Sequence, residues 1–260
     1  SLPLAGILFD VDLTLTNSQR QVSPAVQEAL AALATRQLPI GVCTGRTYVS
    51  LQQTILPLFP AQSLHVVAGG SQLITKEGDV RWQQLLPAAT VREITQLADQ
   101  LGEMYYLATP QQGFGNARFI GRYQNLHHLI PPLRPVSELT TWAVPALVCV
   151  NVSPDFLAQL QRRTDITLKT SLSTQNFVSL DITPVGITKA SGVQAWCQHL
   201  DISPAQVIGI GDSDNDREFL AAVGTAVAMG NSTPAVQALA DEVIGDTDAD
   251  GLAVYLQRVL

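Results

Sequence analysis

The chain has 260 residues, of which 46% are hydrophobic and only 14% are charged, and its formal net charge at pH 7 is −7. This length fits one large domain or two modest ones, and the apolar share is enough for a full core, which excludes a disordered chain. With 15 basic residues against 22 acidic ones, the composition also excludes a basic surface that would bind nucleic acid or an anionic membrane.

Short apolar strands alternate with helical stretches in the first part of the chain, a pattern typical of a parallel-sheet α/β fold. Ser23 followed by Pro24 predicts the capped start of a helix. The elements expected in this part are strands at 5–9, 39–43 and 64–68, helices at 24–36 and 47–56, and a hairpin of strands at 72–75 and 80–84.

The middle of the chain has a different character, with strands clustered beside two helices. Residues 110–142, rich in Gly, Pro, Gln and His, carry no pattern that assigns them. The elements expected here are helices at 87–101 and 154–163 and strands at 104–108, 145–152, 167–172 and 177–182.

From residue 187 the alternation returns. The elements expected here are a helix at 187–200, strands at 206–210, 225–228 and 242–244, and helices after 215, from 234 and at the C-terminus. We therefore expect an α/β fold with a Rossmann-like, doubly wound parallel-sheet core that is interrupted by an inserted α+β cap domain. The core would comprise residues 1–83 and 184–260, and the inserted domain residues 84–183.

The sequence carries no sign of export or membrane insertion. The first apolar run is short and ends at Asp10, unlike a signal peptide, and no run approaches the ~18 apolar residues of a membrane span. The three cysteines, Cys43, Cys149 and Cys197, are far apart, which argues against a disulfide framework and against a thiolate zinc site. We expect a cytoplasmic protein.

Two acidic clusters follow predicted strands. Asp10 and Asp12 come directly after the first strand, and Asp212, Asp214 and Asp216 come after the strand at 206–210. In open α/β sheets, the crevice beyond the carboxyl ends of the strands is where ligands bind. Carboxylates that converge there would repel one another, and a hard cation such as Mg²⁺ or Ca²⁺ would relieve that repulsion.

Simpler interpretations of these clusters compete with a metal site. A single Asp after a strand often only caps a helix or closes a turn, an explanation that two clusters make weaker. An EF-hand loop starting at Asp212 fails, because Arg217 and Val223 stand where that loop needs Gly and Glu. The spacings of the dinucleotide-binding, P-loop and α/β-hydrolase motifs are also absent.

Two further features could bind phosphate. The second strand ends in Cys43-Thr44-Gly45-Arg46, where a hydroxyl, a turn that glycine permits and the N–H groups opening a helix would form an anion cradle. Lys189 is one of only three lysines and stands where the core resumes, so it could balance both carboxylates and phosphate. The alternative is a solvated lysine, although the first turn of a helix is a poor place for a cation.

At these residues the sequence resembles the haloacid dehalogenase-like phosphohydrolases, and among them the Cof-type phosphatases with a large α/β cap. Two positions depart from the family pattern: Leu13 stands where Gly is usual, and Ala68 where Asn is more common. The motifs that match in order and spacing are D-x-D-x-T at 10–14, Thr44-Gly45-Arg46, Lys189, and G-D-x-x-N-D at 211–216.

The resemblance implies a Mg²⁺-dependent phosphatase that acts on small phosphorylated metabolites, sugar phosphates first, through an aspartyl-phosphate intermediate. In that mechanism Asp10 is the nucleophile, and Asp12 is the general acid and then the general base. The other implied roles are metal binding by Asp10, Asp12, Asp212 and Asp216, and phosphate binding by Thr44, Gly45, Lys189 and Asn215.

The inserted domain would be a cap that closes over the site, excludes water and contacts the leaving group, so that it selects the substrate. For each candidate contact in it, the alternative is a solvated surface residue. These candidates are Arg118, Arg122, His127, His128 and Arg134.

Two rival functions remain open at this point. One is a phosphomutase of the same fold, similar to the phosphomannomutases, although the Asp212 motif fits the Cof pattern better. The other is a non-catalytic metal-binding protein, which the presence of Asp10, Asp12 and Lys189 together disfavours.

Overall fold

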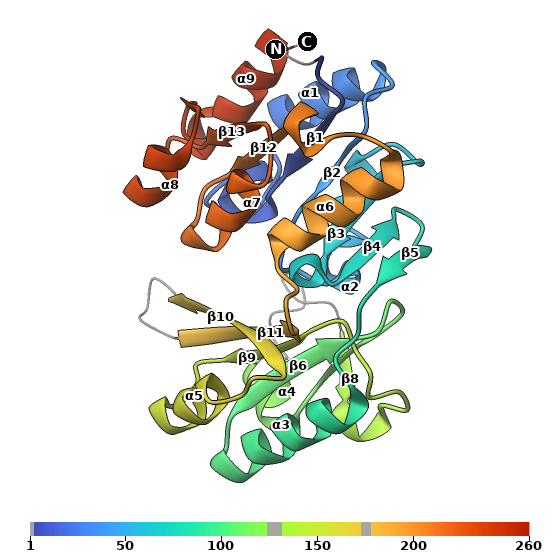
Figure 1. Ribbon diagram of the computed structural model, residues 1–260, viewed down its shortest axis with the longest axis vertical. Coiled ribbons are helices and arrows are strands. Elements are labelled where there is room, and N and C mark those ends of the chain that lie inside the picture. Colours follow the sequence, from blue (N-terminus) through green and yellow to red (C-terminus); the bar gives the residue numbers. More distant parts are fainter. Residues whose placement is uncertain (1–2, 124–131, 173–177, 260) are drawn as a thin grey trace.

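A parallel five-stranded sheet, in the order β14-β13-β12-β1-β2, forms the centre of the part of the chain drawn in blue and in orange to red (Figure 1). The computed structural model describes residues 3–123, 132–172 and 178–259. Every neighbouring pair of strands in this sheet is parallel. The strands are β1 (Gly6–Phe9), β2 (Ile40–Val42), β12 (Val207–Gly211), β13 (Thr225–Ala228) and β14 (Glu242–Val243).

Helices cover both faces of this sheet, and the burial of β1 shows why. Ile7 and Phe9 belong to an apolar cluster with α1 and α9, while Leu8 belongs to a second cluster with α6, α7 and α8. A strand that is apolar at every position is typical of a parallel sheet buried on both sides. The doubly wound core that the sequence predicts is confirmed. Its helices are α1 (Pro24–Ala34), α2 (Tyr48–Leu51), α6 (Lys189–Leu200), α7 (Arg217–Ala221), α8 (Pro234–Leu239) and α9 (Gly251–Val259).

A three-stranded antiparallel sheet continues the core beyond β2. A parallel bridge between Cys43 and Val66 links the two sheets, and the predicted hairpin forms β4 and β5. The strands of this small sheet are β3 (Leu64–Val67), β4 (Gln72–Thr75) and β5 (Val80–Gln83).

The chain leaves the core after β5 and returns at α6, and between these points it builds a second sheet in the order β10-β11-β9-β6-β7-β8. This sheet is antiparallel except for the pair of β7 and β8, and Figure 1 shows it lying below the core. The inserted α+β domain of the predicted fold class is therefore present. Its strands are β6 (Met104–Ala108), β7 (Gly113–Gly115), β8 (Leu133–Pro135), β9 (Leu147–Val150), β10 (Ile166–Leu172) and β11 (Val178–Pro184).

The two faces of the second sheet have different surroundings. Helices α3 (Ala88–Leu101) and α5 (Pro154–Gln161) bury one face, where Tyr105, Leu147 and Leu180 join their apolar cluster. The opposite face turns toward the core. Helix α4 (Ala117–Tyr123) lies on this side, because its Phe119 ring packs 5.0 Å from the ring of Tyr106.

Two parts of the sequence prediction differ from the structure. Helix α2 covers only Tyr48–Leu51 of the predicted 47–56, and turns connect it to a short 3-10 helix at Leu56–Leu58. The unassigned residues 110–142 contain β7, α4 and β8. In β7, a Cβ on Gly113 would lie 2.5 Å from Leu133, so this glycine permits close strand packing rather than a turn.

Over the described ranges, no helix is long and apolar enough to cross a membrane. All three cysteines are buried and free.

Candidate active site

The carboxyl ends of the three neighbouring strands β2, β1 and β12 meet at one edge of the core sheet. Asp10 follows β1, Thr44 follows β2 and Asp212 follows β12. The sheet order thus brings together motifs that lie about two hundred residues apart in the sequence, as the crevice rule for open α/β sheets predicts.

Two glycines let backbone segments of the site approach each other closely. A Cβ on Gly211 would lie 2.9 Å from the carboxyl group of Asp216, and one on Gly70 would lie 2.0 Å from the carbonyl oxygen of Thr188. Contacts this short have no room for a side chain, so glycine at each position keeps Asp216 and the start of α6 at the site.

Three carboxylates form the acidic cluster of the site. One oxygen each from Asp10, Asp212 and Asp216 lies within 4.8 Å of the others, and their residues are only 6%, 6% and 0% exposed. Burial and the neighbouring Asp216 charge raise the pKa of Asp10 well above its usual value and raise the pKa of Asp212 to about 7. A set of buried, mutually repelling oxygen donors fits a hard divalent cation.

Lys189 lies between two of these carboxylates. Its Nζ donates to Asp10 Oδ1 at 2.8 Å and to Asp216 Oδ1 at 2.5 Å, and the lysine side chain is 12% exposed. Burial lowers the pKa of Lys189, but Asp10 and Asp216 together raise it well above its usual value. The alternative of a solvated lysine at the start of α6 is therefore wrong.

Asp216 also fixes the loop that carries Asp212. Its Oδ2 accepts hydrogen bonds from the backbone N–H groups of Asp212 and Ser213, both at 3.1 Å. Thr14 donates through its hydroxyl to Asp212 Oδ1 at 3.3 Å. The two acidic motifs thus share one hydrogen-bond network.

Asp12 has a partner that the sequence analysis did not assign. Arg46 donates from Nε to Asp12 Oδ2 at 2.8 Å and from Nη2 to Asp12 Oδ1 at 2.5 Å, a bidentate pair. The Asp12 side chain is 53% exposed, whereas Asp10 is buried. The two aspartates of the first motif therefore occupy different environments, one inside the site and one at its mouth.

The predicted phosphate-binding residues lie around a small cavity. Gly45, Lys189 and Asn215 line it together with Asp181. Thr44 is buried beside it, and its hydroxyl accepts from the Arg46 N–H at 3.1 Å, which fixes the turn.

The candidate substrate contacts of the inserted domain lie elsewhere or outside the described residues. The guanidinium of Arg118 lies 3.3 Å from the position of a Cβ on Gly102 at the end of α3, and Arg122 is exposed. Neither lines the small cavity. Arg134 pairs with Glu138, and His127 and His128 fall outside the described ranges.

Three other polar side chains of the second sheet, those of Lys169, Asp181 and Tyr106, face the site. Lys169 on β10 lies opposite Asp181 on β11, and Val148 on β9 separates Asp181 from Tyr106 on β6. In β11, apolar and polar residues alternate, a period-two signal that places Asp181 on the polar face of its strand. The sequence could show that alternation, but not that this face turns toward the core.

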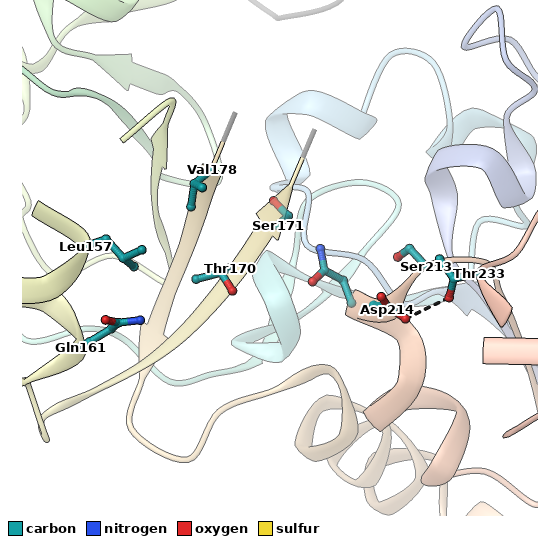
Figure 2. A pocket seen from close by; sticks show the side chains of 9 residues that line it. Leu157, Gln161, Thr170, Ser171, Val178, Ser213, Asp214 and Thr233 are labelled. Atoms are coloured by element: carbon teal, nitrogen blue, oxygen red, sulfur yellow. Dashed lines mark hydrogen bonds between the residues drawn. The ribbon is translucent and has the colours of Figure 1, made fainter. Parts of the chain in front are cut away.

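A larger cavity opens between the second sheet and the core (Figure 2). Its empty volume is about 990 Å³, part of which is open solvent, and Asn215 belongs to both cavities. Asp214, to which the sequence analysis gave no role, accepts here from the Thr233 hydroxyl at 2.9 Å (dashed in Figure 2). The other lining residues are Leu157, Gln161, Thr170, Ser171, Val178 and Ser213.

The chain matches a known family over nearly its whole length. Residues 7–256 match the haloacid dehalogenase-like hydrolase family. Among curated proteins, an HMP-PP phosphatase of Serratia proteamaculans is 26% identical over 260 residues, covering 97% of this chain and 94% of that protein.

Solved structures share the fold over the same length. A haloacid dehalogenase-like hydrolase from Bacteroides thetaiotaomicron has a TM-score of 0.82 at 21% identity, covering 99% of this chain and all of that one. A sugar phosphatase described as subclass IIB of the same superfamily has a TM-score of 0.80 at 20% identity and covers 98% of both chains.

Proposed function

The chain belongs to the haloacid dehalogenase-like hydrolase family, and on this premise we propose that it removes phosphate from small phosphorylated compounds through an aspartyl-phosphate on Asp10. Family membership confirms the resemblance drawn from the motifs, and with it the expectation of a phosphatase of this type.

The observation that carries the proposal is the position of Lys189 against a buried Asp10. A carboxylate needs no general base to act as a nucleophile, but it must meet an anionic phosphate. The ammonium group of Lys189, 2.8 Å from Asp10 Oδ1, supplies positive charge where the nucleophile and the phosphoryl oxygens would meet.

The proposed reaction has two steps. Asp10 forms a bond to phosphorus as the bond to the leaving-group oxygen breaks, and Asp12 gives that oxygen a proton. Asp12 then takes a proton from the water that attacks phosphorus, which frees Asp10 and releases inorganic phosphate. Arg46 holds the Asp12 carboxylate at the mouth of the site through its bidentate contact.

We propose Mg²⁺ as the cation of the acidic cluster, with Asp10 and Asp212 as carboxylate ligands and Asp12 contributing its main-chain carbonyl. When bound, the metal would offset the charge of the nucleophile and of the phosphoryl group. Both oxygens of Asp216 already accept hydrogen bonds, so we assign it to holding Lys189 and the Asp212 loop behind the metal ligands.

The phosphoryl oxygens would lie in the small cavity, bound by Gly45, Lys189 and Asn215, with Thr44 fixing the turn that carries Gly45. These residues supply backbone N–H, ammonium and amide donors, the groups that stabilise charge developing on phosphoryl oxygens. Their common position at this cavity supports the assignment.

We also propose separate roles for two domains of the chain. Residues 1–83 and 184–260 would form the catalytic core and residues 84–183 the cap, because the second sheet is built within that insertion. The acidic charge supports a small-molecule substrate rather than nucleic acid or a membrane, and the free cysteines are compatible with a cytoplasmic protein.

The substrate would be a small phosphorylated compound. The sequence resemblance favours a sugar phosphate, whereas the curated relative is named for HMP-PP. A panel containing both kinds of compound would choose between them.

A generic aryl phosphate tests the chemistry without a choice of substrate. We expect wild-type protein with Mg²⁺ to release inorganic phosphate, and chelation or Asp10→Asn to abolish the release. Phosphate release to water also separates a phosphatase from a phosphomutase, which would return the phosphoryl group to an organic acceptor. Activity that survives in Asp10→Asn would refute the mechanism.

A further inference from the structure

We propose that Asp181 is a specificity residue that binds a hydrogen-bond donor, above all a protonated amine, on the leaving group. This inference rests on the proposed phosphatase function, and it names a class of substrate for the same site: phosphate esters whose leaving group carries an amino group near the ester oxygen.

Asp181 lies at the phosphate-binding cavity. Its Oδ2 lies 3.6 Å from the point that a Cβ on Gly45 would occupy, and it shares the small cavity with Gly45, Lys189 and Asn215. A phosphate held by those three residues would therefore place its ester substituent beside this carboxylate.

Asp181 also differs from the neighbouring carboxylates in its hydrogen bonding and ion pairing. Within the described ranges, no hydrogen bond or ion pair is made by its side chain, whereas the surrounding carboxylates are all engaged. Asp12 pairs with Arg46, Asp10 and Asp216 with Lys189, Asp212 with Thr14, and Glu218 with Lys169. A partly buried carboxylate without a donor is unfavourable, and a donor on the substrate would satisfy it.

The balance of charge around the cavity favours the same class of leaving group. Three cationic side chains of the described structure lie near it, and each is already paired with a carboxylate: Lys189, Arg46 and Lys169. An anionic leaving group would find no unpaired cation there and would face Asp181. A cationic or neutral donor meets no such repulsion.

The described residues that line the larger cavity also lack an unpaired cation. Asn215 connects it to the phosphate site, and Figure 2 shows the side chains of Thr170 and Ser171 on one side and those of Ser213 and Thr233 on the other. Hydroxyls and amides supply most of its polar groups, Asp214 supplies the charged one, and no lysine or arginine is among its described lining residues.

A near-isosteric series of esters tests the inference: 2-aminoethyl, 2-hydroxyethyl and propyl phosphate. They differ only in whether the terminal group is an ammonium, a hydroxyl or a methyl. The assay pH is about 8, at which the amine is protonated. This pH also lies above the pKa of about 6 that burial gives Asp181, so the carboxylate is ionised. Under these conditions kcat/KM should fall in the order given. The first and last members should differ by about tenfold or more, the effect expected of one hydrogen bond to a charged group.

The Asp181→Asn variant keeps the shape of the side chain and removes its charge. We expect it to lose most of the preference for 2-aminoethyl phosphate over propyl phosphate. The matched control is Asp155→Asn on α5, an exposed carboxylate of the same inserted domain, which should keep the wild-type order.

The outcomes separate the two proposals. Hydrolysis of all three esters without an amine preference, or a preference that survives in Asp181→Asn, would overturn the role of Asp181 and leave the phosphatase function standing. If wild-type protein hydrolyses none of the three esters nor the aryl phosphate, the proposed function fails and this inference fails with it.

Discussion

Replacing Lys189 with Met would remove the only charge that touches both Asp10 and Asp216 in the described structure. Both carboxylates are buried, so the variant leaves two negative charges close together and out of water. Removing one partner of a buried ion pair costs about 3–5 kcal/mol. For a chain of this length each kcal/mol lowers the melting temperature by roughly 2–4 °C, so we expect a fall of about 6–20 °C.

The measurement is thermal unfolding followed by circular dichroism, with a chelator present so that no cation replaces the lost ammonium group. The matched control is Lys169→Met, which makes the same chemical change at the partly exposed pair with Glu218. Exposed pairs contribute less than about 1 kcal/mol, so the control should melt within a few degrees of wild type. A Lys189→Met variant that melts together with Lys169→Met would refute the view that this lysine neutralises the site.

Three further predictions concern stability and need no substrate. Mg²⁺ should raise the melting temperature of chelator-treated wild type by mass action, and Asp212→Asn should lose most of this increase; an equal increase in the variant would place the ion elsewhere. Burial lowers the pKa of His65 from 6.5 to about 3, so its neutral form stabilises the fold above pH 6.5, and this contribution is lost as the pH falls toward 3. Between pH 7 and pH 5 the free energy of unfolding should fall by roughly 2 kcal/mol from this source. The His65→Gln variant, although less stable overall, should lose less stability than wild type over the same pH range. Equal losses in the two proteins would contradict this. Leu13 has a φ of 59° and is 42% exposed, so its backbone is left-handed and its side chain contributes little to the core. In urea unfolding, Leu13→Gly should therefore keep wild-type stability, whereas the β-branched Leu13→Val should lose about 1 kcal/mol or more. Equal stability of the two variants would show that the turn carries no strain.

The sequence was most informative where chemistry and topology coincide. Asp10 and Asp212 each follow an apolar run, and parallel strands place such residues at a common edge, so their meeting could be predicted without a structure. The departure at Leu13 was also visible, but its meaning was not. Only the backbone shows that this residue adopts the left-handed conformation that glycine adopts freely.

The inserted domain was harder to predict for physical reasons. Strand β7 is Gly-Phe-Gly, which carries no alternation, and it forms because Gly113 lets Leu133 pack against it. Asp181 lies on the polar face of β11, but which face of the sheet meets the core depends on how α3 and α5 cover the other. The side chains of this domain that face the site are set by cross-strand register, which the candidate arginines do not share.

The central claim is that Asp10 carries the phosphoryl group during turnover, and trapping that group tests it most directly. The Asp12→Asn variant should accumulate the intermediate from an aryl phosphate, because the leaving group departs without an acid while the second step lacks its base. After acid quenching, mass spectrometry of the peptides should place one phosphoryl group on Asp10. A phosphoryl group on any other residue, or turnover with an unmodified Asp10 throughout, would contradict the account.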